Sequence, residues 1–185
     1  MRIISGKYKG RKINPPNGTN VRPTADFARE GLFNILANYI DFESSDILDL
    51  FSGTGSVSFE FASRGALNVH LVEKDPRLIS FINRMVNELN FINIRVIHIG
   101  VRDFLKTCYS KYDIVFADPP YNLPWLSDLP EMVMNAGILK DDGVFILEHP
   151  GIISFKNHSF FSEHRHYGNV NFSFFKPKDQ IKNQL

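Results

Sequence analysis

The chain contains 185 residues, of which 43% are hydrophobic and 22% charged, and its formal net charge is +1. This length predicts one domain with a sizeable core, and the composition is that of an ordinary globular protein. The single cysteine, Cys108, excludes an internal disulfide and provides no metal-ligand spacing. The sequence shows no apolar signal segment at its start and no run of membrane-span length, so we expect a cytoplasmic protein that binds neither metal nor membrane.

Residues 1–23 are predicted to form a basic amino-terminal arm. The charged residues before Asp26 are all cations, namely Arg2, Lys7, Lys9, Arg11, Lys12 and Arg22. Two glycines and alternating apolar and polar positions favour a short hairpin or an extended segment over a helix. Such an arm suits the phosphate backbone of a nucleic acid. A solvated surface hairpin explains the same pattern, and the sequence leaves both interpretations open.

Residues 24–177 are predicted to form the main domain, which begins with a helix. Thr24 is the expected N-cap, Asp26 lies in the first turn, and an apolar stripe follows. Arg22 and Arg29 flank the start of this helix. They either face a nucleic acid or pair with acids such as Glu30.

The rest of the domain alternates between apolar strands and amphipathic helices. Strands are predicted at 47–51, 69–73, 95–99, 113–117 and 144–148, and helices at 56–65, 76–89, 103–109 and 125–136. Two aromatic-rich segments, 160–167 and 170–175, flank a two-residue hairpin signal. The pattern predicts an α/β fold with a mostly parallel seven-stranded sheet, helices on both faces and a C-terminal antiparallel hairpin. Residues 178–185 are expected to be a frayed tail.

The strand that begins at Asp113 ends in Asp118-Pro119-Pro120-Tyr121. Its apolar, partly β-branched residues are typical of a strand buried on both faces. The two prolines end the strand and keep the backbone extended beyond it. A carboxylate, exposed carbonyl groups and an aromatic ring are therefore expected at the carboxyl end of a buried strand, where open α/β sheets bind ligands. An ordinary proline turn is the competing interpretation.

A second candidate site is the glycine-rich turn that follows the strand 47–51. Gly53 and Gly55 allow the backbone to approach a ligand, and Glu73 ends the next strand, where a ribose diol could bind. Ser58 stands where a dinucleotide site would carry a third glycine, which weakens that interpretation. Asp49 would repel a pyrophosphate but suits a cationic ligand. Together these residues favour a nucleoside that carries a sulfonium group and an amino acid.

These residues resemble those of S-adenosylmethionine-dependent methyltransferases that modify exocyclic amino groups. The matching segments are Asp49 to Gly55, Glu73 and Asp118 to Tyr121. The arm, the segment Arg22 to Glu30 and Phe33-Asn34 narrow the resemblance to the 16S rRNA (guanine-966 N2)-methyltransferase family, over nearly the whole chain. This resemblance implies a Rossmann-like class I methyltransferase fold and S-adenosylmethionine as the cofactor.

The same resemblance implies roles for individual residues. The expected cofactor-binding residues are Asp49, Phe51, Gly53, Thr54, Gly55, Glu73, Lys74, Asp103 and Asp118. Within this set, the loop from Asp49 would cradle the methionine part, Glu73 would bind the ribose and Asp103 would lie near the adenine. The expected catalytic residues are Asp118, Pro119 and Tyr121. The expected RNA-contacting residues are Arg2, Lys7, Lys9, Arg11, Lys12, Arg22, Thr24, Arg29, Pro120 and Tyr121.

The predicted reaction is methyl transfer to the N2 amine of a guanine in 16S rRNA, carried out by a monomer on naked RNA or on a small-subunit assembly particle. The Asp-Pro-Pro-Tyr element suits any planar amine, so adenine-N6 methylation of DNA or RNA is an alternative. A non-catalytic RNA-binding module is a further alternative, which Asp118 and Tyr121 disfavour. A dinucleotide oxidoreductase is a more distant one. Glu148-His149 ends a strand at the same edge, and either a substrate contact or a structural role fits it.

Overall fold

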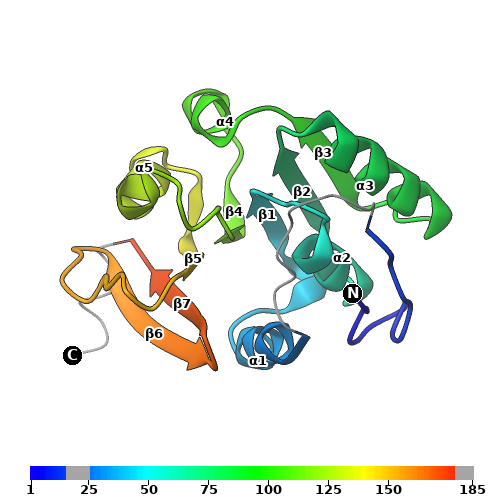
Figure 1. Cartoon of the computed structure of the whole chain (residues 1–185), viewed down its shortest axis with the longest axis horizontal. Coiled ribbons are helices and arrows are strands. Elements are labelled where there is room, and N and C mark those ends of the chain that lie inside the picture. Colours follow the sequence, from blue (N-terminus) through cyan, green and yellow to red (C-terminus); the bar gives the residue numbers. More distant parts are fainter. Residues whose placement is uncertain (16–25, 178–185) are drawn as a thin grey trace.

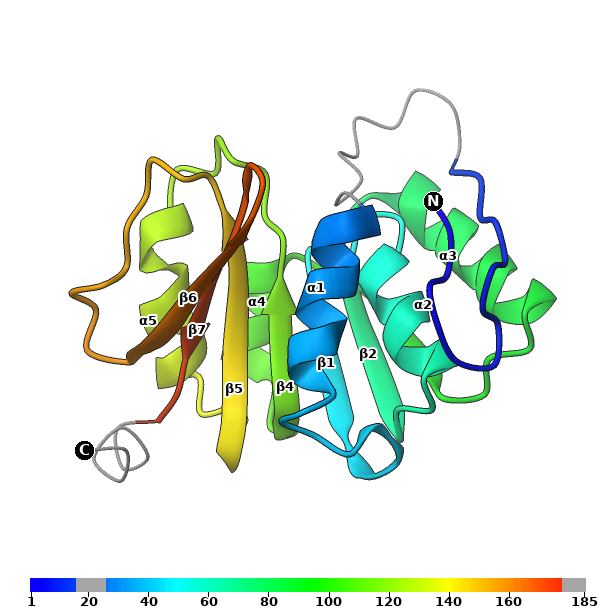
Figure 2. The same ribbon diagram turned by 90° about the horizontal axis from the view of Figure 1, so that it is seen from below.

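The structure is a computed structural model that describes residues 1–15 and 26–177. The sheet formed by these residues has seven strands in the order β3-β2-β1-β4-β5-β7-β6. Strands β1 to β5 pair in parallel, and β7 pairs antiparallel with both β5 and β6. Helices cover both faces of the sheet (Figures 1 and 2). The predicted α/β fold with its mostly parallel sheet and C-terminal hairpin is confirmed.

The elements follow the alternation that the sequence predicts. The α-helices are α1 (Asp26–Leu36), α2 (Ser56–Ser63), α3 (Pro76–Glu88), α4 (Val101–Thr107) and α5 (Leu129–Asn135). The strands are β1 (Asp46–Leu50), β2 (Asn68–Glu73), β3 (Ile94–His98), β4 (Tyr112–Ala117), β5 (Leu139–His149), β6 (Phe161–Tyr167) and β7 (Val170–Phe175). Short 3-10 helices at Phe42–Ser44 and Leu126–Asp128 precede β1 and α5. Within the described ranges, no helix is long and apolar enough to cross a membrane.

The central strand β4 sends side chains into two separate hydrophobic cores. Ile114 and Phe116 pack in the core that contains residues of α1, α2 and α3. Val115 and Ala117 pack in the core that contains residues of α4 and α5. All four side chains are buried. Because β4 is buried on both faces, its sequence is an unbroken apolar run rather than an alternation of apolar and polar residues.

Strand β5 begins at Leu139 rather than at the predicted residue 144. Leu139 pairs with Tyr112, and the register then shifts before Val144 pairs with Ile114. Gly143 lies in this irregular stretch, where an added Cβ atom would come within 2.8 Å of the Tyr112 carbonyl oxygen. A glycine therefore permits the close approach of two backbones. The charged residues before Gly143 interrupt the apolar pattern, which is why the sequence suggests a later start.

Three predicted helix starts differ from the structure or fall outside its described part. Helix α5 begins at Leu129, after the 3-10 helix at Leu126–Asp128, rather than at residue 125. Helix α4 begins at Val101, two residues before the predicted start at Asp103. Its first turn therefore includes Arg102, a residue that no sequence pattern singles out. Helix α1 is described from Asp26 onward, so the proposed N-cap Thr24 and the neighbouring Arg22 lie outside the described residues.

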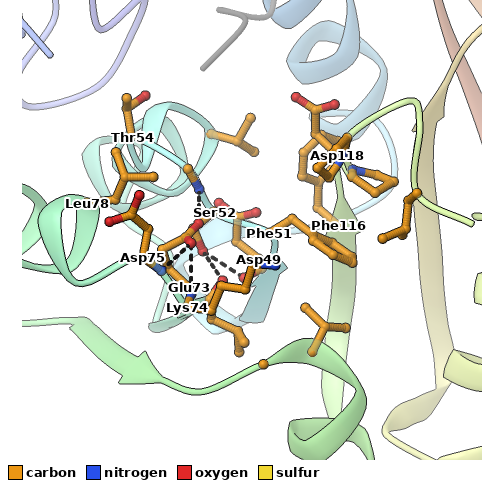
Figure 3. A pocket seen from close by; sticks show the side chains of 18 of the residues that line it. Asp49, Phe51, Ser52, Thr54, Glu73, Lys74, Asp75, Leu78, Phe116 and Asp118 are labelled. Carbon is orange, nitrogen blue, oxygen red and sulfur yellow. Dashed lines mark hydrogen bonds between the residues drawn. The ribbon is translucent and has the colours of Figure 1, made fainter. Parts of the chain in front are cut away.

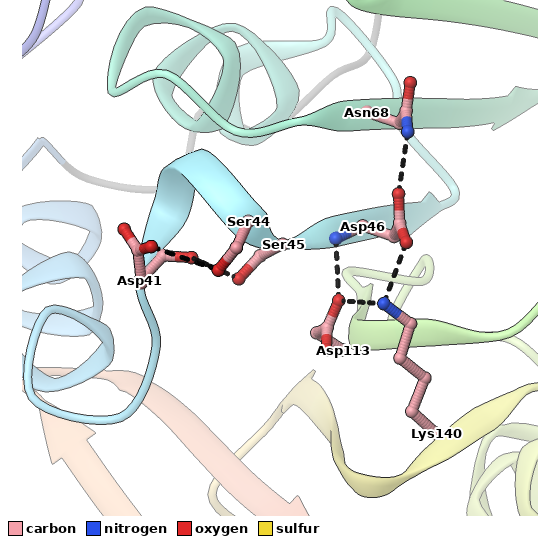
Figure 4. A network of polar contacts seen from close by, with 7 residues as sticks. All are labelled: Asp41, Ser44, Ser45, Asp46, Asn68, Asp113 and Lys140. Carbon is pink, nitrogen blue, oxygen red and sulfur yellow. Dashed lines mark hydrogen bonds and ion pairs between the residues drawn. The ribbon is translucent and has the colours of Figure 1, made fainter.

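The ammonium group of Lys140 ties together the amino ends of neighbouring strands (Figure 4). Its Nζ atom lies 2.8 Å from Asp46 Oδ2 on β1 and 2.7 Å from Asp113 Oδ2 on β4. Asn68 on β2 donates a hydrogen bond to Asp46 Oδ1 at 2.7 Å. Burial alone would raise the pKa of Asp46, but the hydrogen bond from Asn68 and the charge of Lys140 outweigh burial and lower it. This network stabilises the strand register at the edge of the sheet opposite the predicted ligand site.

Replacing Lys140 with methionine should lower the free energy of unfolding by about 1 kcal/mol, because two carboxylates would then face each other without a cation. Urea denaturation measures this change. Lys106→Met is the matched control, since Lys106 pairs with Asp103 at 3.8 Å with side chains 75% and 71% exposed. The control should change stability by less than about 0.5 kcal/mol. Equal losses in the two variants would contradict the role assigned to Lys140.

Candidate active site

A cavity of about 730 Å³ lies at the carboxyl ends of β1, β2, β3 and β4. Its volume is within the range of small-molecule and cofactor sites. The loops that follow these four strands supply its walls, and Figure 3 shows their side chains converging on it. In an open α/β sheet this edge is the expected place for a ligand. The structure thus joins the two candidate sites of the sequence, the glycine-rich turn and the Asp-Pro-Pro-Tyr element, in one cavity.

The turn between β1 and α2 is held in an unusual backbone conformation. Phe51, Gly53 and Gly55 have positive φ angles of 60°, 56° and 75°. The Ser52 amide donates to the Val72 carbonyl on β2 at 3.1 Å, and the Ser52 hydroxyl donates to the Asp49 carbonyl at 2.9 Å. A left-handed conformation at Phe51, which is not a glycine, is unfavourable unless surrounding contacts impose it, and such residues cluster at functional sites.

Gly55 contributes to the shape of this turn rather than to the cavity wall. It precedes α2, and an added Cβ atom would lie 3.0 Å from the Phe59 ring and 3.3 Å from Leu71. Its positive φ angle and this close packing both favour glycine. The cavity wall itself includes Gly53 and Thr54 but not Gly55. Gly55 thus has a packing role, and its contact with the cofactor stays a prediction.

Glu73 connects the end of β2 with the glycine-rich turn (Figure 3). Its Oε2 atom accepts a hydrogen bond from the Gly53 amide at 2.9 Å, and its Oε1 atom accepts from the Lys74 and Asp75 amides at 2.8 Å each. The side chain is nearly buried and lines the cavity. These three hydrogen bonds hold the Glu73 carboxylate in one orientation in the cavity wall.

Asp49 is a second buried acid in the cavity wall. It is 2% exposed, and its Oδ2 atom accepts a hydrogen bond from the Ser58 hydroxyl on α2. Burial raises the pKa of Asp49 to about 7, and the negative charge of Glu73 adds to this effect. Ser58 occupies the position where a dinucleotide site would have a glycine, and here its hydroxyl group holds the acid. A cation bound in the cavity would favour the ionised form of Asp49.

The structure brings most of the predicted ligand-contacting residues into the cavity wall. They are Asp49, Phe51, Gly53, Thr54, Glu73, Lys74, Asp118, Pro119, Pro120 and Tyr121. Asp118 directly follows β4, which ends at Ala117, and Figure 3 shows its carboxylate across the cavity from Thr54 and Leu78. The prolines stop the strand at the cavity rim, as the sequence predicts. The individual roles of these residues remain predictions.

Asp103 is not among the residues that line the cavity. Its side chain is 71% exposed and pairs with Lys106 at 3.8 Å. The preceding residues Gly100, Val101 and Arg102 form this part of the wall instead. Because α4 begins at Val101, Asp103 lies in its first turn, and its Oδ2 atom is 3.8 Å from where a Cβ atom would stand on the wall residue Gly100. The role of Asp103 near the adenine stays a prediction.

The sequence did not indicate a group of stacked side chains at the cavity. The Arg102 guanidinium lies 4.5 Å from the centre of the Trp125 ring, and the Phe51 ring lies 5.8 Å from that of Trp125. Arg102 lies in the first turn of α4, and Trp125 and Phe51 lie in the segments after β4 and β1, so the three side chains meet only in the folded chain. Trp125 is the single tryptophan of the sequence. Apolar side chains of Leu78, Ile99 and Val101 complete this wall.

The proposed RNA-contacting residues fall into two groups. Arg2, Lys7, Lys9, Arg11 and Lys12 are exposed on the arm. Arg29 is only 1% exposed, and its Nη2 atom donates to Asp26 and to the Arg2 carbonyl. Arg29 thus binds the backbone of the arm from the protein interior and does not face a nucleic acid, which corrects its assignment as an RNA contact. Arg22 and Thr24 lie outside the described residues.

His149 has a structural role. It is buried, its Nδ1 atom lies 3.1 Å from the Pro150 carbonyl and its Nε2 atom lies 2.8 Å from the Ser173 hydroxyl. A carbonyl only accepts hydrogen bonds, so Nδ1 carries the proton and Nε2 accepts from Ser173. Burial lowers the pKa of His149, which keeps the ring neutral. Among the described residues, no group of three or more acids, histidines and cysteines is arranged to hold a metal ion.

The sheet order, the glycine-rich turn after β1 and the acid at the end of β2 define a Rossmann-like class I methyltransferase fold. Residues 1–176 match the model of a family described as conserved hypothetical protein 95. Ribosomal RNA small subunit methyltransferase D of Buchnera aphidicola subsp. Baizongia pistaciae is 34% identical over 148 residues, which are 80% of this chain and 75% of the relative. The protein of the same name from Escherichia coli K12 is 33% identical, over 80% of this chain and 74% of the relative. The chain belongs to the ribosomal RNA small subunit methyltransferase D family.

Solved structures agree with this assignment. A hypothetical protein of Thermus thermophilus superposes with a TM-score of 0.84 and 27% identity, covering 96% of this chain and 99% of its own. The Escherichia coli protein named "Putative methyltransferase yhhF" superposes with a TM-score of 0.82 and 29% identity, covering 96% of this chain and 98% of its own. The superpositions therefore extend over almost the whole length of these proteins.

Asp49→Asn should change how stability depends on pH. The pKa of Asp49 is about 7 in the folded protein, above the ordinary value of 3.8. The folded protein therefore binds more protons than the unfolded chain between these two values, so the contribution of this group to stability falls as pH rises from the lower to the upper one. The variant is neutral at every pH, so its free energy of unfolding should exceed that of the unmodified protein by up to about 4 kcal/mol at pH 8 and by little near pH 4.

Denaturation at a series of pH values measures this difference. Asp103→Asn is the matched control, because its carboxylate is largely in solvent. The control should follow the pH profile of the unmodified protein. Parallel pH profiles for the Asp49 variant and the unmodified protein would contradict the buried, raised-pKa state of Asp49.

Proposed function

We propose that the protein transfers the methyl group of S-adenosylmethionine to the exocyclic N2 amine of a guanine in small-subunit ribosomal RNA. The observation that carries this proposal is the shared cavity. Asp118-Pro119-Pro120-Tyr121 faces the same space as Asp49, Glu73 and the glycine-rich turn. The names of the relatives support a substrate in small-subunit ribosomal RNA. The choice of guanine N2 rests on the sequence resemblance described above.

The residues of the cavity fit S-adenosylmethionine. Two acids, Asp49 and Glu73, lie in its wall, which suits a cationic sulfonium and disfavours a pyrophosphate. Glu73 offers its carboxylate to the ribose, and the apolar side chains near Ile99 and Val101 suit a purine ring. The turn from Phe51 to Thr54 would hold the methionine part. When bound, this cofactor supplies an electrophilic methyl group.

Asp118 and Pro119 would prepare the target amine. The lone pair of an exocyclic guanine amine is delocalised into the ring, which makes it a poor nucleophile. The Asp118 carboxylate and the Pro119 carbonyl are two acceptors for the two N–H groups of this amine. Accepting both hydrogen bonds orients the nitrogen and favours a more tetrahedral geometry, and correct positioning can supply much of the rate. As the N–C bond forms and the bond from the methyl group to the sulfonium sulfur breaks, Asp118 would stabilise the positive charge on the nitrogen, which then releases one proton to solvent.

Tyr121 would hold the base after it leaves its own stack. Its ring lines the cavity beside Pro120. A base that reacts at an exocyclic atom has to be unstacked or extruded before it can enter an enclosed site. Aromatic side chains stack on unpaired bases in many RNA-binding proteins. Tyr121 is therefore the residue expected to face the ring of the target base.

Incubation with labelled S-adenosylmethionine and unmodified small-subunit ribosomal RNA or particles tests the proposal. After digestion, the labelled nucleoside should be N2-methylguanosine. Labelled N6-methyladenosine would contradict the guanine target and favour the adenine alternative. The absence of label on both RNA and particles, with cofactor binding intact, would contradict the enzymatic function and favour an RNA-binding module.

Substitutions at Asp118 and Glu73 should impair different steps: the first mainly methyl transfer, the second mainly cofactor binding. Asp118→Ala removes an acceptor for the target amine and should lower the rate of methyl transfer at saturating cofactor by at least about 100-fold, while it should change cofactor affinity less than Glu73→Ala does. Glu73→Ala should raise the dissociation constant of the cofactor about tenfold or more, because a bidentate charged partner is lost. Calorimetry with S-adenosylhomocysteine measures affinity, and single-turnover assays measure transfer. Full activity of the Asp118 variant, or unchanged affinity of the Glu73 variant, would contradict the assignment.

A further inference from the structure

The first segment of the arm runs along helix α2 (Figure 2). At the start of α2, the Thr54 hydroxyl lies 3.5 Å from the Met1 sulfur. At its end, the Ser63 carbonyl accepts a hydrogen bond from the Lys7 amide at 2.7 Å. Helix α2 has eight residues, so it is about 12 Å long. The arm therefore extends from the rim of the cavity, where Thr54 lies, to the opposite end of this helix.

A fully buried acid on α2 binds the backbone of the arm. Glu60 is 0% exposed, and its Oε2 atom accepts from the Ile4 amide at 2.7 Å. Its Oε1 atom accepts from the Ser5 amide at 3.0 Å and from Arg64 Nε at 2.8 Å. Both carboxylate oxygens thus have partners, which a buried charge requires. No step of the proposed reaction uses Glu60.

Ser63 binds the next residues of the arm. Its Oγ atom accepts from the Tyr8 amide at 3.0 Å and donates to the Ser5 carbonyl at 2.6 Å. Gly6 lies directly over the Ser63 carbonyl, where an added Cβ atom would come within 1.8 Å of the oxygen. On the other side of the arm, Arg29 donates to the Arg2 carbonyl. Side chains of α1 and α2 therefore hold the arm by its backbone.

Holding the backbone leaves the cations of the arm free to face outward. Ile3 and Ile13 are buried against the core. The five cations of this segment are exposed, namely Arg2, Lys7, Lys9, Arg11 and Lys12. Over residues 1–15 and 26–177, none of them forms an ion pair with an acid. The result is a cationic track of fixed shape that begins beside the cavity.

We propose that Glu60 and Ser63 are positioning residues that fix this cationic track, and that the track binds the phosphate backbone of the RNA that flanks the target nucleotide. This inference rests on the proposed function. The track leads away from the cavity along α2, so its phosphate contacts lie beyond the nucleotide that enters the cavity. A docked arm has less conformational freedom to lose on binding than a free one, which strengthens binding without further contacts.

Gly6→Ala and Gly10→Ala form a matched pair of variants that tests this inference. Both glycines have positive φ angles, 79° and 82°, so alanine is strained to a similar degree at each. Only Gly6 contacts Ser63, because an added Cβ atom at Gly10 has nothing within 4 Å. Gly6→Ala should release the arm, seen as faster amide hydrogen exchange of the Ile4, Ser5 and Lys7 amides. It should weaken RNA affinity about tenfold, whereas Gly10→Ala should not.

Neither glycine variant should change the affinity for S-adenosylhomocysteine. Both variants keep the five cations of the arm, so a change in RNA affinity reports the position of these cations and not their number. Ser63→Ala is a milder second variant and should weaken RNA binding in the same direction. With RNA shortened to the target nucleotide and its immediate neighbours, the Gly6 variant and the unmodified protein should bind equally. A released arm with unchanged affinity for the long RNA would overturn the inference, as would an arm that stays docked in Gly6→Ala.

The salt dependence of RNA binding gives an independent readout. Lys7→Ala and Lys9→Ala should each lower the slope of log K against log salt by up to about 0.9, the contribution of one phosphate contact. Lys106→Ala on α4 is the control and should leave the slope unchanged. Equal salt-dependence slopes in all three variants would overturn the inference that the cations of the arm contact RNA phosphates. RNA affinity is measured without turnover, so a failure of methyl transfer by the unmodified protein would contradict the proposed function and not this inference.

Discussion

The position of helix α2 is the constraint on which both the cavity and the arm depend. Three contacts fix its start: Ser58 bonds to Asp49 on β1, Glu73 on β2 accepts from Gly53, and Gly55 lets Phe59 pack close to Leu71. The same helix carries Glu60 and Ser63, which hold the arm. A shift of α2 would therefore change the shape of the glycine-rich turn and the position of the cationic surface together. The two parts of the proposed RNA enzyme share one rigid support.

Three buried acids lie around α2, and they differ in the hydrogen-bond donors that contact their carboxylate groups. Glu60 receives two backbone amides and the Arg64 side chain, and Glu73 receives three backbone amides. Asp49 has the Ser58 hydroxyl as its side-chain partner and lies near the charge of Glu73, so its pKa is raised to about 7. Burial costs each acid its hydration; each glutamate accepts three hydrogen bonds, whereas Asp49 accepts hydrogen bonds from Ser58 alone among the contacts that shift its pKa. Asp49 is thus the acid that gains most from a bound cation.

The candidate site was largely predictable because its main parts are local in sequence. Asp118-Pro119-Pro120-Tyr121 ends a strand by the chemistry of proline, and the glycines after β1 mark a turn, whatever the rest of the chain does. Parallel strands present their carboxyl ends at one edge, so the sequence also places Glu73 beside that turn. Arg29 was misplaced for the opposite reason. Whether a charged residue on a helix faces solvent, a cavity or another segment depends on where that helix begins and on what packs against it.

The alternation of strands and helices, the C-terminal hairpin and the residues at the strand ends could all be predicted from the sequence. Hydrophobic periodicity, prolines and glycines are local signals, because each acts over only a few residues. Tertiary packing alone places Glu60 as a buried anchor, Arg29 against the backbone of the arm, and Arg102 and Phe51 against the ring of Trp125 at the cavity. These contacts join residues that are far apart along the chain. No local pattern distinguishes a glutamate that faces solvent from one that binds the backbone of a segment more than fifty residues away.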